Sequence, residues 1–158
     1  RQEVIDRTAA AIRSGAKLVT GGKKTHHKEG FWLSPAVLNY SDSSLKLISE
    51  ETFGNVLPIM VVKDEKQAIK EANNTQYGLS NSVYTQDIKK AQELAVQLES
   101  GMVFINDPFI AIPGWDHWTG WKDSGFGTTE SKFMQMLKKK VVSVNKKSHT
   151  REFWYPYE

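Results

Sequence analysis

Two adjacent carboxylates, Glu50 and Glu51, stand in the stretch of this sequence that is best equipped for chemistry. A phenyl ring at Phe53 and a glycine at Gly54 follow directly, and the chain then enters an apolar run at 57–62. Because such a run suits a strand that is covered on both faces, we expect the carboxylate pair where this strand enters its sheet. Charged side chains at that position form a binding site or cap a helix.

The elements in front of this stretch begin with amphipathic helical spacing over residues 1–14. No Ser, Thr, Asp or Asn precedes this helix as an N-cap, which indicates a chain cut from a longer protein. A short strand at 17–20, an extended segment at 31–38 and a short helix at 45–48 follow. Pro35 is expected to confine the extended segment to a sheet edge or a bulge.

The elements behind it alternate between strand and helix patterns. This alternation predicts right-handed βαβ crossovers, a parallel sheet and an α/β fold. Asp64 is expected to cap one helix, with Ala68, Ile69 and Ala72 pointing inward, and Thr85 or Asp87 to cap the next. The predicted elements are a helix at 65–73, a strand at 82–84, a helix that ends at 99 and a strand at 102–105.

Residues 106–129 differ in character, with prolines, glycines and three tryptophans but little periodicity. A loop this long in a compact domain is more often functional than idle. Aromatic residues after a parallel strand also lie where α/β proteins bind ligands. The alternative is an irregular cover packed over the sheet.

The C-terminal part predicts a short helix at 130–137 and a strand at 141–144 that lysines flank on both sides. Lysine flanks are typical of edge strands. Nucleic-acid binding is an alternative role for these lysines, but a useful footprint needs several phosphate contacts from one face, and here the lysines bracket a strand. We expect the aromatic tail at 153–157 to dock on another surface.

Composition narrows the classes of protein. The chain has 158 residues, 39% of them apolar, which is enough for one core, and a net charge of +3. It contains no cysteine, which excludes disulfides, thiolate metal sites and a cysteine nucleophile within this chain. It has no apolar stretch of membrane-spanning length and no signal sequence at Arg1. We expect a soluble, cytoplasmic protein without a metal site, with His26 and His27 in a solvated loop.

Four ordered motifs resemble the C-terminal part of the NAD(P)-dependent aldehyde dehydrogenase superfamily, and together they cover essentially the whole chain. The resemblance implies an incomplete parallel βαβ sheet of that family's catalytic domain at 1–138. It implies an oligomerisation strand with an aromatic tail at 139–158. The motifs are Glu50-Glu51-Thr52-Phe53-Gly54-x-Val56-Leu57-Pro58, Ala68-x-x-x-Ala72-Asn73-x-Thr75-x-Tyr77-Gly78-Leu79, Gly101-x-Val103-x-Ile105-Asn106 and Gly120-x-Lys122-x-Ser124-Gly125-x-Gly127.

The resemblance implies that Glu51 and Phe53 bind NAD or NADP. In the family, a Glu-x-Phe-Gly motif presents a carboxylate to the ribose hydroxyls beside the nicotinamide and a phenyl ring to the nicotinamide itself. A carboxylate accepts well from vicinal hydroxyls, and a ring holds a planar heterocycle by stacking. The alternative for Glu51 is a helix cap. On the substrate side, the resemblance implies Trp118 in the wall of the aldehyde tunnel and Phe109 in the loop before it.

Three departures from the family pattern leave the substrate class open. Asn55 replaces the usual proline, which is expected to loosen the turn while leaving Glu51 and Phe53 in place. Residues 117–122 (HWTGWK) stand where the family has Pro-Phe-Gly-Gly-x-Lys, and Thr128-Thr129 stand where Arg-Glu is common.

The resemblance places the family's nucleophilic cysteine, general-base glutamate, oxyanion-binding asparagine and Rossmann half before this segment, so no catalytic residue is expected in this chain. It implies an inactive fragment of an aldehyde dehydrogenase whose parent oxidises an aldehyde to a carboxylic acid with NAD(P). The alternative is a non-catalytic binding or assembly module with the same fold. A homo-oligomer is also implied, because the family's matching strand extends a neighbouring subunit's sheet. We expect the strand here to keep unpaired backbone groups, and neither nucleic acid nor membrane as a partner.

Overall fold

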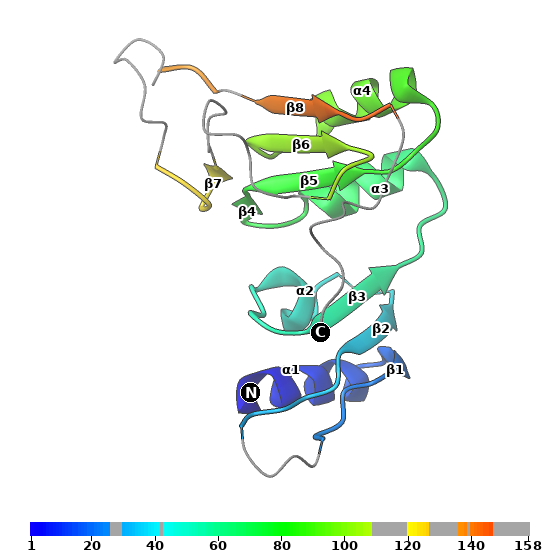
Figure 1. Cartoon of the computed structure of the whole chain (residues 1–158), viewed down its shortest axis with the longest axis vertical. Helices are drawn as coiled ribbons and strands as arrows, with labels where there is room; N and C mark the ends of the chain where they lie inside the picture. Colours follow the sequence, from blue (N-terminus) through cyan, green and yellow to red (C-terminus); the bar gives the residue numbers. More distant parts are fainter. Residues whose placement is uncertain (26–29, 42, 109–119, 127–135, 139, 147–158) are drawn as a thin grey trace. The chain divides into compact units, whose positions relative to one another are not determined.

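The computed structural model describes residues 1–25, 30–41, 43–108, 120–126, 136–138 and 140–146 (Figure 1). The chain packs as two compact units, Arg1–Thr75 and Gln76–Glu158, where its length alone suggests one. Both units combine helices with parallel strand pairs, so the predicted α/β class is confirmed.

The first unit is built on a three-stranded sheet in the order β1-β2-β3. β1 (Lys17–Thr20) runs antiparallel to β2 (Ala36–Tyr40), and β2 runs parallel to β3 (Val56–Met60). The helices of this unit are α1 (Gln2–Arg13), α2 (Lys46–Ser49) and α3 (Glu65–Asn73).

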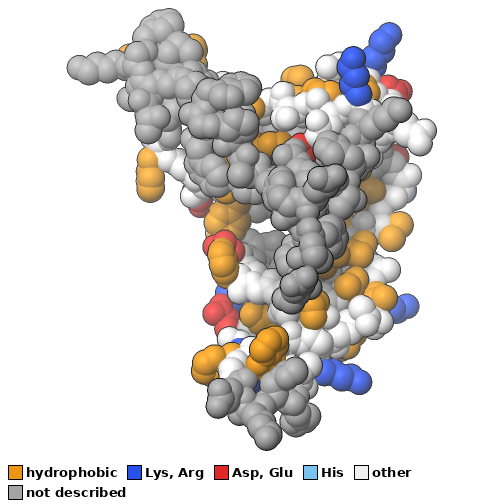
Figure 2. Space-filling view, in the orientation of Figure 1, with side chains coloured by type: hydrophobic (Ala, Val, Ile, Leu, Met, Phe, Trp, Pro, Cys, Tyr) orange, Lys and Arg blue, Asp and Glu red, His pale blue; other side chains and the backbone are white. Residues whose placement is uncertain are grey.

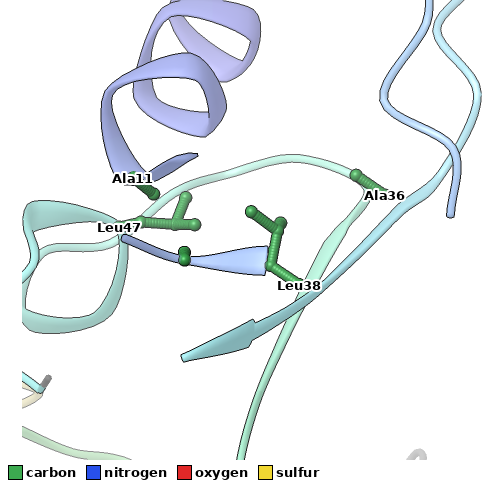
Figure 3. Packing of buried hydrophobic residues seen from close by; sticks show 5 residues of the cluster. Ala11, Ala36, Leu38 and Leu47 are labelled. Carbon is green, nitrogen blue, oxygen red and sulfur yellow. The ribbon is translucent and has the colours of Figure 1, made fainter. Parts of the chain in front are cut away.

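The core of the first unit lies where α1 and α2 meet β2. Leu38 of β2 is fully buried, and Ala36, Ala11 of α1 and Leu47 of α2 are buried around it. Figure 3 shows Leu38 and Leu47 directed into the same space. Burying a leucine side chain of this kind stabilises the fold by about 1.5–3 kcal/mol.

Two expectations about this sheet are wrong. Pro35 lies just before β2 and not within it, so the extended segment becomes the central strand. β3 is an edge strand of this sheet, where Pro58 lacks a backbone donor without breaking the sheet. Its burial alternates, with Leu57 57% and Ile59 43% exposed, so the apolar run is not covered on both faces by the described residues.

The helix α3 is bounded as predicted but packs differently. The Gln67 N–H donates to Asp64 Oδ1 at 2.8 Å, which confirms the predicted cap. Ala68 and Ala72 are exposed and Ile69 is only partly buried, so the expected inward face is wrong for the described structure.

The second unit contains a parallel sheet in the order β5-β6-β8 (Figure 1). Its strands are β5 (Ser80–Val83), β6 (Met102–Ile105) and β8 (Val141–Val144), and β6 is buried along its whole length. The helix α4 (Ile88–Gln97) connects β5 to β6 and packs on β6. Asp87 is its N-cap and accepts from the Lys90 N–H at 3.0 Å, which settles the choice between Thr85 and Asp87.

The strand β8 lies at the edge of its sheet, as predicted, but it has a partner in its own chain. The Val141 N–H donates to the Gly101 carbonyl at 2.8 Å, and the Asn145 N–H donates to the Ile105 carbonyl at 3.0 Å. The expectation that its backbone groups stay unpaired is therefore wrong for the edge that faces β6.

Several sequence expectations fall outside the described residues: His26 and His27, most of the helix at 130–137, and the tail at 153–157. In the part of the chain that is described, no helix combines the length and the apolar character that crossing a membrane requires. The same part brings together no group of three His, Cys, Asp or Glu side chains that could hold a metal ion.

Candidate functional site

The two adjacent carboxylates lie in the turn between α2 and β3 and have different surroundings. Glu50 follows α2 as its C-cap residue, and its carboxylate lies 3.3 Å from an Arg7 guanidinium nitrogen and 3.6 Å from Lys46 Nζ. Arg7 also pairs with Glu3 at 3.0 Å, so Glu50 belongs to an ion-pair network that joins α1 to α2.

Glu51 is exposed and forms no hydrogen bond or ion pair with the described residues. Among the described helices, side-chain caps come only from Asp64 and Asp87, so no described helix uses Glu51 as a cap. Of the two carboxylates, Glu51 is therefore the one available to a ligand.

Phe53 presents its ring to solvent, with 94% of the residue exposed. It lines an open depression of about 730 Å³ together with the exposed rings of Phe31 and Trp32. The Arg1 guanidinium lies 5.3 Å from the centroid of the Phe31 ring. Figure 2 shows hydrophobic side chains reaching the surface on the face in view. Rings exposed in this way suit the flat face of a heterocycle. Glu51 does not line the depression.

The turn that carries Glu51 and Phe53 is fixed by packing and hydrogen bonds. A Cβ on Gly54 would lie 2.5 Å from Val4 Cγ2, so only glycine lets α1 pack here without displacement. Asn55 Nδ2 donates to the Leu33 carbonyl at 2.7 Å, and the Asn55 carbonyl accepts from the N–H of the first β2 residue at 2.9 Å. The expectation that Asn55 loosens the turn is therefore wrong, because its side chain ties the turn to the segment before β2.

The later motifs meet in the second unit, where they are structural. β4 (Tyr77–Gly78) pairs antiparallel with β7 (Trp121–Lys122), and the Gly78 N–H donates to Ser124 Oγ at 3.0 Å. Lys122 Nζ lies 2.8 Å from the Glu99 carboxylate, and its hydrogen bond holds the pKa of Glu99 below the usual 4.5. These contacts fasten the 120–126 segment to β4 and, through Glu99, to the chain between α4 and β6.

A polar cluster that the sequence did not predict lies after the C-terminal ends of β5 and β6. Asn106 has a left-handed φ of 55° and is only 6% exposed. Its Oδ1 accepts from the Thr85 N–H at 2.9 Å, and its Nδ2 donates to the Thr85 carbonyl at 2.8 Å. Next to it, Asn145 Nδ2 donates to Asp107 Oδ2 at 2.6 Å. Burial, followed by the charge of Asp107, raises the pKa of Tyr84. The cluster sets the direction in which the chain leaves β6.

The predicted substrate-side residues, Phe109 and Trp118, lie outside the described residues. The roles that the resemblance implies for them stay predictions.

Sequence reasoning also missed Lys140, which it treated as one of several lysines flanking an edge strand. Lys140 Nζ donates to the carbonyls of Ala95 at 2.7 Å, Val96 at 3.2 Å and Leu98. It also lies 4.9 Å from the centroid of the Trp121 ring. In the sequence, Lys140 is marked only by its position directly before an apolar strand. That position predicts a contact with α4 only when β8 is already known to pass the C-terminal end of that helix.

Comparison with known proteins gives consistent matches. The sequence pattern described as the aldehyde dehydrogenase family matches residues 1–142. Betaine aldehyde dehydrogenase of Bacillus subtilis (strain 168) is 40% identical over 121 residues, which are 73% of this chain and 24% of that protein. The peroxisomal aminoaldehyde dehydrogenase 1 of Pisum sativum is 35% identical over 130 residues, which are 80% of this chain and 25% of that protein.

A solved structure of betaine aldehyde dehydrogenase from Staphylococcus aureus in complex with NAD+ matches with a TM-score of 0.76 at 35% identity. The match covers 80% of this chain and 26% of that one. The chain thus spans about a quarter of the length of these relatives. Since the family pattern extends over nearly all of the sequence and the fold agrees with it, this chain belongs to the aldehyde dehydrogenase family.

Proposed function

We propose that this chain works as part of an NAD(P)-dependent aldehyde dehydrogenase that oxidises an aldehyde to a carboxylic acid. The observation that supports this function is that two side chains in one short turn are both available to a ligand. Glu51 has no hydrogen-bond or ion-pair partner among the described residues, and the ring of Phe53 is almost fully exposed. A carboxylate and a ring in this spacing offer the two contacts that a nicotinamide riboside needs, hydroxyl acceptance and a flat apolar face.

In this proposal Glu51 accepts hydrogen bonds from the ribose hydroxyls and Phe53 holds the nicotinamide ring. NAD(P), when bound, supplies the hydride acceptor. The two side chains act by position, because hydride transfer depends steeply on the distance and angle between donor and acceptor. The chain supplies no thiol for attack on the aldehyde, since it contains no cysteine.

Glu51→Gln tests the cofactor role in an enzyme that carries this segment together with a catalytic cysteine. We expect hydride transfer to slow by up to about 10²-fold, because the nicotinamide end is misplaced, while the Kd of NAD(P) changes much less. Hydride transfer is measured by rapid mixing with a deuterated aldehyde, and Kd by fluorescence titration.

Glu50→Gln is the matched control in that experiment. It removes a carboxylate next to Glu51 but acts on the ion pairs with Arg7 and Lys46, so it should lower stability and leave hydride transfer unchanged. Unchanged turnover in Glu51→Gln, or equal slowing in both variants, contradicts the assignment.

The 158-residue chain on its own is expected to be inactive. A purified sample incubated with NAD+ or NADP+ and a panel of aldehydes should form no NADH or NADPH. Formation of reduced cofactor in a sample free of other dehydrogenases would overturn this part of the proposal.

On the substrate side, we propose that Phe109 and Trp118 line the path of the aldehyde. Trp118→Ala in the active enzyme should improve kcat/KM for bulky aldehydes relative to small ones, because removal of a large ring widens the path. An unaltered ranking across short, long and aromatic aldehydes would show that Trp118 has only a structural role.

We also propose a homo-oligomer that assembles through β8, whose outer edge has no strand partner among the described residues. Val142 and Val144 are partly exposed beside that edge. Association should increase with salt, because screening weakens the repulsion between the flanking lysines. Val142→Lys should shift sedimentation towards the monomer, whereas a monomer at high salt and high concentration for the unsubstituted chain contradicts the idea.

A further inference from the structure

The C-terminal end of α4 gathers three backbone carbonyls around one point. The last carbonyls of a helix have no partner within the helix. Here Ala95 and Val96 direct theirs to the Lys140 ammonium, at 2.7 and 3.2 Å. Leu98, whose φ of −75° and ψ of 127° end the helix in an extended turn, adds a third carbonyl to the same group.

Three further groups around this ammonium attract a positive charge. The face of the Trp121 ring lies 4.9 Å away, a distance at which a ring attracts a cation. Burial lowers the pKa of Lys140, and the carboxylate of Glu99 opposes that effect as a nearby opposite charge. The negative end of the α4 dipole adds to the same field.

We propose that the C-terminal end of α4 is a site for a monovalent cation, which the chain fills with the ammonium group of Lys140. Backbone carbonyls arranged around a point replace the water shell of K⁺ in ion-selective proteins. The lysine ammonium and NH4⁺ are close to K⁺ in size, so one set of carbonyls accommodates all three. Lysine suits the site because its charge is compact, whereas the planar fork of arginine matches a carboxylate better than a ring of carbonyls.

The Lys140 ammonium has a structural role because it is attached to the residue that precedes β8. β8 begins at Val141, the residue after Lys140, and the Val141 N–H donates to the Gly101 carbonyl at 2.8 Å. The bound ammonium therefore holds the first residue of β8 against the end of α4. This task does not depend on cofactor binding or on the aldehyde reaction, so it is tested separately from the proposed function.

Lys140→Met tests the site, because methionine keeps an unbranched side chain that ends one atom before the ammonium nitrogen, and so removes the charge and its donors. The Tm of the purified chain is measured in KCl, NH4Cl and choline chloride at equal ionic strength. In choline chloride the variant should melt about 4–8 °C below the unsubstituted chain. K⁺ or NH4⁺ should restore at least half of that loss, because a cation that binds only the folded state stabilises it, whereas choline is too large to enter.

Lys138→Met is the matched control. Lys138 lies over the same Trp121 ring, 5.7 Å from its centroid, but donates to none of the three carbonyls. For the Lys138→Met variant, and likewise for the unsubstituted chain, the Tm should be the same in KCl, NH4Cl and choline chloride. The proposal is overturned if Lys140→Met and Lys138→Met have the same Tm in choline chloride. It is also overturned if Lys140→Met has the same Tm in KCl and in choline chloride.

A measurement on the unsubstituted chain covers the case in which Lys140→Met does not fold. Nitrogen-15 NMR of the lysine side chains reports how fast each ammonium exchanges its protons with water. Lys140 should exchange at least about tenfold more slowly than Lys138, because its protons are held by carbonyls. Equal exchange at the two lysines contradicts the site.

Discussion

Replacing Asn106 should destabilise the chain more than any single exposed substitution. Asn106 is buried, has a left-handed backbone, and satisfies both backbone groups of Thr85 with its amide. Asn106→Ala removes both hydrogen bonds to Thr85, together with a longer one that Asn106 Nδ2 donates to the Asn145 carbonyl at 3.4 Å, and keeps a residue with a Cβ at φ 55°.

The magnitude follows from these contacts. Each Thr85 group that is left without a partner costs about 1–2 kcal/mol, so the two together cost about 2–4 kcal/mol. A left-handed φ adds about 1 kcal/mol for alanine, whose side chain cannot compensate by local hydrogen bonding. Asn106→Ala should therefore lose about 3–5 kcal/mol, and Asn106→Gly about 1 kcal/mol less, because glycine tolerates this φ.

Urea unfolding followed by circular dichroism measures these differences as shifts of the midpoint at a constant slope. Asn106→Asp serves as an intermediate control, because it keeps the acceptor for the Thr85 N–H and loses the donor to the Thr85 carbonyl. The reasoning is refuted if Asn106→Ala costs less than about 1 kcal/mol, or if Asn106→Gly is the less stable of the two.

Other parts of the chain give three further expectations. Gly78→Ala should cost about 1–3 kcal/mol in urea unfolding, because its Cβ would lie 2.5 Å from the Glu99 carbonyl oxygen, and a neutral result would mean that β4 shifts freely. Asn55→Ala should cost about 0.5–1.5 kcal/mol by the same assay, since it removes the hydrogen bond to Leu33, and no loss would mean that the turn is held by packing alone. The pKa of Glu99 is lowered in the folded state by its contact with Lys122, so this ion pair stabilises the fold fully at pH values above the usual pKa of 4.5. That stabilisation is lost as the pH falls through the folded-state pKa. Tm measured from neutral pH to below 4.5 should thus fall less steeply in Lys122→Met, and an identical slope would exclude this pair as a source of acid sensitivity.

The elements that the sequence predicted best carry strong local signals. Asp64 and Asp87 stand directly before apolar spacing of helical period, and both cap helices in the structure. The strand at 102–105 is a short apolar run after a glycine, and it became the fully buried β6. Local backbone preference and burial agree in these places, so the sequence was sufficient.

Burial was harder to predict than the elements themselves. Leu57, Ile59, Ala68 and Ala72 fit apolar patterns and are nevertheless exposed over the described residues. Periodicity shows that a face is apolar, but it carries no information about which segment packs against that face.

The candidate site shows the same limit. Residue types and spacing selected the Glu50-Glu51-Thr52-Phe53 stretch, but only Arg7, which comes from a different helix, shows that Glu50 is the structural carboxylate. Asn106 and Lys140 were missed because their roles depend on Thr85 and on the end of α4, which come close only after the parallel sheet has formed.

The position of β6 between β5 and β8 has a consequence for synthesis on the ribosome. β6 pairs residue 102 with residue 80 on one side and with residue 141 on the other. One neighbour therefore precedes β6 in the nascent chain, and the other appears only after residues 106–140 have been made. During that interval an apolar strand has a bare edge, which is the state in which chains aggregate or recruit chaperones. The strand order in space thus sets an order in time, in which β8 docks last and closes the period of greatest risk for the newly made chain.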